Sequence, residues 1–279
     1  MIDAILQYTF MKNAVAAALL SSVVAGIIGV IAVEKRLSSM AGGIAHAAFG
    51  GIGLGYLLGF EPIWGGLTFA TASSVLIGKL PQNSKLNADT LTGILWSLGM
   101  ALGILFISLA PGYMPDMSSY LFGDILSVST SSLMYMTAFT CVVVLLFLLF
   151  LNHFTLYLLD EQYASSQGIH TGVLRLITYI IIPVGIIVMT NVVGIILTIA
   201  LMTVPASLSK LLFKSIGKVV ISSVIVSALL SLGGIAISYY VEIPSGACIV
   251  MLCAASYFLA LFLKKILTKA IHKARGHRE

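Results

Sequence analysis

The stretch "MAGGIAHAAFGGIGLGYLLG" covers residues 40–59 and decides the fold class. It contains no Asp, Glu, Lys or Arg, and it is long enough to cross a bilayer as one helix. Gly51, Gly55 and Gly59 recur at intervals of four, and small residues at that spacing let membrane helices pack with their backbones close together. We therefore expect a tightly packed membrane-spanning helix with one titratable residue, His46, inside it.

The rest of the chain has the same apolar character. Of its 279 residues, 59% are hydrophobic and 9% are charged, whereas soluble domains carry about 25% charged residues. Apolar runs of about 20 residues predict membrane-spanning helices. The predicted class is an all-α integral membrane protein, with residues 1–279 forming a single membrane domain of about 8–9 transmembrane helices.

Windows of about 20 residues place the candidate spans. They lie near 10–33, 41–60, 62–80, 90–110, 130–152, 174–190, 191–211, 217–240 and 244–263. The block 174–212 can form two crossings or one crossing and a half-helix. Pro183, the sequence "TNVVG" at 190–194 and Pro205 are all places where a helix can break.

The basic residues indicate the orientation. With nine crossings and the N-terminus outside, 14 of the 15 Lys and Arg residues fall on one side: Lys35, Arg36, Lys79, Lys85, Arg175, Lys210, Lys214, Lys218, Lys264, Lys265, Lys269, Lys273, Arg275 and Arg278. An excess of Lys and Arg marks the cytoplasmic side. The C-terminus, with the basic tail 264–279, is therefore expected inside, and the net charge of +5 reflects topology rather than nucleic-acid binding.

His46 admits two interpretations. On a helix it shares a face with Gly42, Gly50 and Gly53, which leaves room beside the ring. An ionisable residue at membrane depth is expensive and faces the protein interior or a watery path. The imidazole is either a neutral group satisfied by a backbone carbonyl, or a ligand or relay in a transport path.

Two connecting segments carry polar residues. The first, "LLDEQYASSQGIHTG" at 158–172, has acidic residues where a short helix would begin and Gly168 where it would end. It is either a solvated connector or a cytoplasmic helix that docks into a partner. The second, "YLFGDILSVSTSS" at 120–132, contains Asp124 and is an interfacial segment, a re-entrant segment or a loop.

The chain lacks a motif for ATP hydrolysis. No G-x-x-x-x-G-K-[ST] sequence occurs, and "GKL" at 78–80 and "GKV" at 217–219 lack both the first glycine and the hydroxyl residue. If ATP drives transport, the ATPase must be another chain, and this chain is not itself an enzyme.

Several blocks together resemble a known family. "KRLSSMAGGIAHAAFGGIGLGYLLG" (35–59) resembles the second-helix region of the permease subunits of zinc and manganese ABC importers. Five further blocks follow in the family's order: "ADTLTGILWSLGMALG" (88–103), "YLFGDILSVS" (120–129), "DEQYASSQGI" (160–169), "NVVGIILTIALMTVPASLSKLL" (191–212) and "YYVEIPSGACIVML" (239–252). The resemblance covers nearly the whole chain.

The resemblance implies partners and site residues. It implies a homodimeric permease in the prokaryotic cell (inner) membrane, a cytoplasmic ATPase on each copy, and an extracellular or periplasmic metal-binding protein. The transported zinc or manganese ion is cargo, and no cofactor is bound permanently. The block at 160–169 resembles the segment that contacts the ATPase, with Asp160, Glu161, Gln162, Tyr163 and Gly168 as its candidate residues.

The family's metal-contacting pair is an Asp and a His one turn apart on the second helix. His46 matches the histidine, but Gly42 stands at the aspartate position. A cation there would lack its anionic partner. Asp116 and Asp124, on the outer side, are candidate entry ligands.

Other functions remain possible from the sequence. A permease of the same architecture for a chelated metal or other small cargo fits the loss of the aspartate. A secondary carrier would normally show intramembrane carboxylates or broken-helix ion sites, and only the block 174–212 offers a break. A purely structural scaffold would not need an intramembrane histidine.

Overall fold

The computed structural model describes residues 7–80, 87–111, 123 and 125–275, with side chains up to residue 266. These residues form α-helices and one 3₁₀ turn, with no strand among them. In chain order the elements are α2 (Thr9–Glu34), α3 (Ser38–Leu58), α4 (Pro62–Gly78), α5 (Ala88–Leu109), η1 (Ile125–Ser127), α7 (Thr130–Leu149), α8 (Leu151–Leu159), α9 (Glu161–Ser166), α10 (Thr171–Val193), α11 (Ile195–Leu212), α12 (Ile216–Val241) and α13 (Ser245–Arg275). The all-α membrane class is confirmed.

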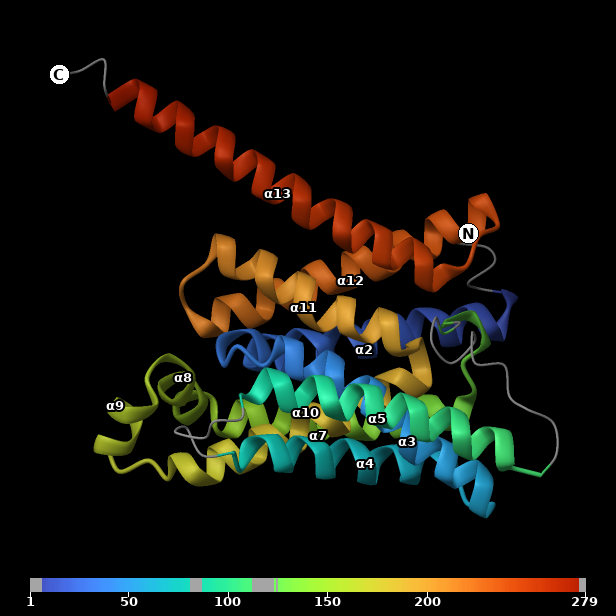
Figure 1. The fold of residues 1–279 in the computed structure, drawn as a ribbon. Coiled ribbons are helices and arrows are strands. Elements are labelled where there is room, and N and C mark those ends of the chain that lie inside the picture. The colour runs from blue at the N-terminus through green and yellow to red at the C-terminus, as the bar shows by residue number, and fades with distance from the viewer. Residues whose placement is uncertain (1–6, 81–86, 112–122, 124, 276–279) are drawn as a thin grey trace.

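The membrane helices run back and forth between two ends of a bundle (Figure 1). Eight helices in the described part are long and apolar enough to cross a bilayer, and α4, with 17 residues, is a shorter apolar helix. At one end, Glu34 accepts a hydrogen bond from Lys210, and Arg175 and Lys35 both donate to Glu161. We call this end, which carries Lys35, Arg175 and Lys210, the basic end; α8 and α9 lie there, and α2 starts at the opposite end.

The block 174–212 forms two helices that both run the length of the bundle. Arg175, near the start of α10, and Lys210, near the end of α11, are both at the basic end, so the chain crosses and returns. The break falls at Gly194, whose φ of 84° and ψ of 165° suit glycine and not residues with a side chain. Pro183 and Pro205 lie within α10 and α11 without ending them.

Glycine allows backbones to touch in two groups of helices. In the first group, α3 contacts α4 and α5: a Cβ built on Gly51 would meet the carbonyl of Gly65, and one built on Gly99 would meet the backbone of Ala47. In the second group, α2 contacts α11 and α12: a Cβ on Gly29 would meet the carbonyl of Met202, and one on Gly26 the backbone nitrogen of Val224 at 2.8 Å. The close packing expected from the glycine spacing is confirmed for α3.

The last helix is longer than the predicted span. The apolar window ended at residue 263, but α13 continues to Arg275. At about 1.5 Å per residue, its 31 residues exceed the bilayer core of about 30 Å. The basic tail predicted from residue 264 therefore continues this helix, which projects from the bundle in Figure 1.

Candidate functional site

His46 lies close to the middle of α3, with Ser38 and Leu58 at the two ends of the helix. Its ring stacks on the indole of Trp96 in α5, with the ring centroids 4.5 Å apart and the planes 2° from parallel. Trp96 is 45% exposed and His46 is partly exposed, so the stacked pair lies at a surface of this subunit. The indole fixes the plane of the imidazole and covers one of its faces.

The buried nitrogen of His46 lacks a partner. Within the described part of the chain, no hydrogen-bonding group reaches Nδ1, which is inaccessible to solvent. The expectation that a backbone carbonyl satisfies the imidazole is therefore not met at this atom. A buried polar atom left unpaired costs about 1–3 kcal/mol.

The space beside His46 differs from the expectation. Gly50 and Gly53 were expected to leave room, but α5 fills it: a Cβ on Gly50 would lie 3.1 Å from the carbonyl oxygen of Gly99, and one on Gly53 would lie 2.6 Å from that of Gly103. The reason is that small residues bring the neighbouring helix in until backbones touch. Gly42 is less tightly packed: a Cβ there would make only an ordinary van der Waals contact, with Ile199 Cδ1 at 3.9 Å.

The donors around His46 are few. Among the described residues, no three or more His, Cys, Asp or Glu side chains come together in an arrangement that could hold a metal ion. Asp116 and Asp124, the candidate entry ligands, lie outside the described residues. In the part of the chain that the structure describes, the site therefore consists of His46, Trp96 and the loosely packed position of Gly42.

The segment 158–172 contains a short capped helix, at the place where the acidic residues and Gly168 predicted its ends. Asp160 Oδ1 accepts hydrogen bonds of 2.9 Å from the backbone nitrogens of Gln162 and Tyr163, which starts α9. The helix ends before Gly168, which adopts φ 80° and donates to Ser165. Tyr163 is 53% exposed, so the helix presents an aromatic side chain outward.

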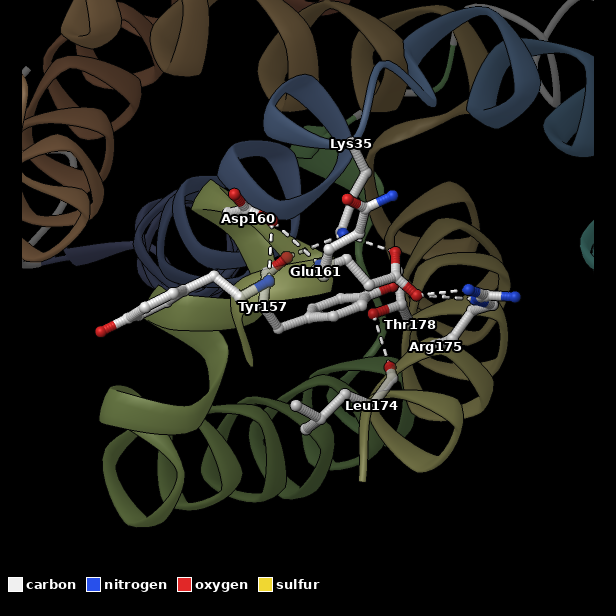
Figure 2. A network of polar contacts seen from close by, with 9 residues as sticks. Lys35, Tyr157, Asp160, Glu161, Leu174, Arg175 and Thr178 are labelled. Carbon is white, nitrogen blue, oxygen red and sulfur yellow. Dashed lines mark hydrogen bonds and ion pairs between the residues drawn. The ribbon is translucent and has the colours of Figure 1, made fainter. Parts of the chain in front are cut away.

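Glu161 holds α9 against two longer helices (Figure 2). Its Oε2 accepts a hydrogen bond of 3.1 Å from Lys35 Nζ, and its Oε1 accepts from Arg175 Nε at 3.1 Å and from a second guanidinium nitrogen. Burial opposes ionisation of the carboxyl, but the hydrogen bonds from Arg175 and Lys35 outweigh burial and hold the pKa of Glu161 below its usual value.

Lys35 is enclosed by the same cluster. Its ammonium also donates to the carbonyl of Tyr157 at 2.8 Å and lies 3.4 Å from the centroid of the Tyr157 ring. Burial lowers the pKa of Lys35, and Glu161 offsets part of that shift. Burial also raises the pKa of the Tyr157 hydroxyl to about 12, so this ring stays neutral beneath the ammonium.

Sequence reasoning missed three of these residues. Lys35 and Arg175 were counted only as positive charges of one membrane face, and Trp96 was not considered. Residues 35 and 161 are 126 positions apart, and no sequence pattern pairs them. Trp96 lies within a block that resembles the metal importers, and an aromatic residue in such a block was the available signal.

Comparisons with known proteins agree with one another. A family model described as "ABC 3 transport family" matches residues 7–264. The chain is 30% identical to the manganese transport system membrane protein MntC of Listeria monocytogenes, over 95% of this chain and 94% of the relative. It is also 30% identical to the manganese import system permease protein ScaB of Streptococcus parasanguinis, over 99% and 98%.

A solved structure shares the fold. The complex of PsaBC from Streptococcus pneumoniae with Fab contains a chain that matches with a TM-score of 0.83 and 26% identity, over 93% of each chain. The arrangement of helices described above therefore has an experimental counterpart over 93% of the chain.

Proposed function

The chain belongs to the ABC 3 transport family, as the permease subunit of a metal ABC importer, and from this we propose that it conducts a divalent transition-metal ion past His46. The observation that carries the proposal is a partly exposed histidine, with one ring nitrogen unpaired, near the middle of a helix long and apolar enough to span the membrane. Imidazole binds first-row transition metals. A path needs binding that is strong enough for entry and weak enough for release, and one imidazole with carbonyls and water meets both conditions.

The proposed cargo is manganese, with zinc as the second metal. MntC and ScaB are named for manganese transport or import. Imidazole suits zinc well, whereas manganese favours oxygen ligands. The missing carboxylate at position 42 therefore predicts weak retention of manganese in the permease itself.

The glycine at position 42, where the family's pattern has an aspartate, also favours a second candidate cargo, a chelated metal. A chelator would supply the anionic ligands that a glycine at position 42 cannot. The same permease would then move a larger, less charged particle.

The subunit is not itself an enzyme, and it works with an ATPase subunit and a binding protein, as permeases of ABC importers do. We place the ATPase contact on the segment of α9, where Gln162 and Tyr163 are exposed, Asp160 caps the helix, Glu161 fastens it to the membrane helices and Gly168 ends it. The remaining proposals are a second copy that completes the path, a location in the prokaryotic cell membrane, and a cytoplasmic basic end and C-terminus, in line with the excess of basic residues there.

Uptake by reconstituted transporter tests the role of His46. In proteoliposomes that contain the permease, its ATPase and its binding protein, His46→Ala is expected to lower ATP-driven uptake of manganese and zinc by about tenfold or more. Assembly of the complex should not change. The matched control is His153→Ala, which removes an exposed histidine of α8 and should leave uptake intact.

Two results would change the assignment. Normal uptake by the His46→Ala variant would show that His46 does not contact the transported ion. Uptake of a chelated metal but of neither free ion would select the second cargo.

A further inference from the structure

The cluster around Glu161 connects three separate parts of the chain. The carboxylate belongs to the first residue of α9, Lys35 follows the last residue of α2, and Arg175 lies in the first turns of α10. Each carboxylate oxygen has its own cationic partner. A short helix of six residues is thereby fixed to two helices that span the membrane.

Lys35 lies in the turn that leads directly into the helix of His46. The turn between α2 and α3 is three residues long, and Arg36 adopts φ 58°, an unusual conformation for a residue with a side chain. Arg36 donates to Val33 at 3.2 Å and Leu37 donates to Ala32 at 2.7 Å. Leu37 in turn accepts a hydrogen bond of 2.8 Å from Ala41 in the first turn of α3. Because the turn is short and bonded to both helices, we expect a displacement of Lys35 to move the start of α3.

The ammonium of Lys35 is more enclosed than that of an ordinary surface ion pair. The Lys35 side chain is 16% exposed, whereas that of Lys210, which pairs with Glu34 at the same end, is 47% exposed; the carboxylate partners, Glu161 and Glu34, are 30% and 12% exposed. Exposed pairs contribute little because water and salt screen them. An enclosed ammonium with a carboxylate, a carbonyl and an aromatic ring as neighbours holds its position more firmly.

We propose that Glu161 is a positioning residue that transmits movement of α9 to the α2–α3 turn, and through this turn to His46. This inference rests on the proposed function, in which α9 receives the movement of the ATPase. When α9 shifts, the carboxylate carries Lys35 and Arg175 with it, so the start of α3 and the start of α10 follow together. Without the carboxylate, α9 keeps its cap from Asp160 and its exposed Tyr163, and it can move alone.

The test compares transport with ATP hydrolysis in the same preparation. Glu161→Gln keeps the shape of the side chain and removes its charge. In the full transporter, we expect ATP hydrolysis to continue while the manganese imported per ATP hydrolysed falls by about tenfold, the factor expected when a charge-assisted hydrogen bond is lost. Glu161→Asp, which keeps the charge, should recover part of the loss.

Glu34→Gln is the matched control. It removes a carboxylate of the same end that pairs with Lys210 and not with α9. Its ratio of transport to hydrolysis should equal that of the wild type. Lys35→Gln should reproduce the defect of Glu161→Gln, and the double variant should be no worse than either single variant, because both remove one link.

Each other outcome has a definite meaning. A normal ratio in Glu161→Gln, or an equal defect in Glu34→Gln, would overturn the role of Glu161. Loss of complex assembly together with hydrolysis would also overturn it, because Glu161 would then be needed for docking itself. If the proposed function itself is wrong, the wild-type transporter will show no ATP-driven uptake of metal, whatever the variants do.

Discussion

At the scale of single residues, Gly42 can accept a new side chain with little disturbance to the fold. A Cβ there meets only Ile199 Cδ1, at 3.9 Å, whereas a Cβ on Gly51 would meet the carbonyl of Gly65 and lie 2.9 Å from Phe69 Cβ. Position 42 is also one helical turn from His46, on the same face. A carboxylate placed here would stand beside the imidazole.

Gly42→Asp is therefore expected to strengthen metal binding. Carboxylate and imidazole together supply the anionic and the nitrogen ligand of a transition-metal site, and we expect retention of manganese and zinc to rise by about tenfold or more. Equilibrium dialysis of the purified transporter measures this. Gly42→Asn adds a side chain of the same size without the charge, and an equal gain from it, or no gain from Asp, would show that position 42 does not face the metal.

At the scale of elements, α9 persists because of contacts outside its own six residues. So short a helix is not stable in isolation. Asp160 caps its start, and Glu161 fastens it to Lys35 and Arg175. The acidic pair at 160–161 thus has two separate tasks, one within the helix and one between helices.

The attachment of α9 has a definite dependence on pH. The pKa of Glu161 is lower in the folded protein than its ordinary value of 4.5, so the stability that its ionised form provides is complete above about pH 4.5 and is lost as the pH falls through the lowered pKa. Lys35 and Arg175, the charged groups that face it, stay protonated throughout this range.

Thermal unfolding of the wild type and of Glu161→Gln in detergent tests this dependence. The wild type should be more stable at pH 7, and the difference should shrink as the pH falls below about 4.5. A difference that stayed constant into the acid range would mean that the charge of Glu161 does not provide the stability.

At the scale of the whole molecule, the orientation in the membrane can be measured directly. Lys12 lies on α2 toward the end opposite the basic end, and Lys214 follows α11 at the basic end; both are exposed. In a variant whose native cysteines are replaced by alanine, an impermeant maleimide applied to intact cells should label Lys12→Cys. Lys214→Cys should be labelled only after the membrane is opened, and the reverse pattern would invert the assignment.

The architecture was largely predictable from the sequence because the bilayer imposes the same requirement on every crossing. Each crossing needs about 20 apolar residues whose backbone groups are satisfied within a helix, so simple windows located the long apolar helices, which are α2–α5, α7 and α10–α13. The double crossing of 174–212 stayed open at that point, since Pro183, residues 190–194 and Pro205 all qualified as breaks. Only the positive φ of Gly194 in the folded chain identifies the true one.

The site was less predictable, for a physical reason. His46 could be found because a titratable residue in an apolar stretch is conspicuous. Its stacking on Trp96, and the contact of Lys35 with Glu161, depend on how separate helices are brought together. The spacing of glycines predicted that α3 packs closely, but it could not predict that α5 would fill the space beside Gly50 and Gly53.

The two groups of glycine contacts also determine where the bundle can deform. Side chains can change rotamer and pack again, but backbones that touch have no such freedom, so α3–α4–α5 and α2–α11–α12 each behave as a stiff plate. Residues 35–37 join the two plates covalently, because they connect α2 to α3. At Gly42 of α3, the contact between the plates is made by the end of the Ile199 side chain of α11. The turn of Lys35 is thus the covalent link between the two plates, so a change in the contact between Lys35 and Glu161 bears on both of them.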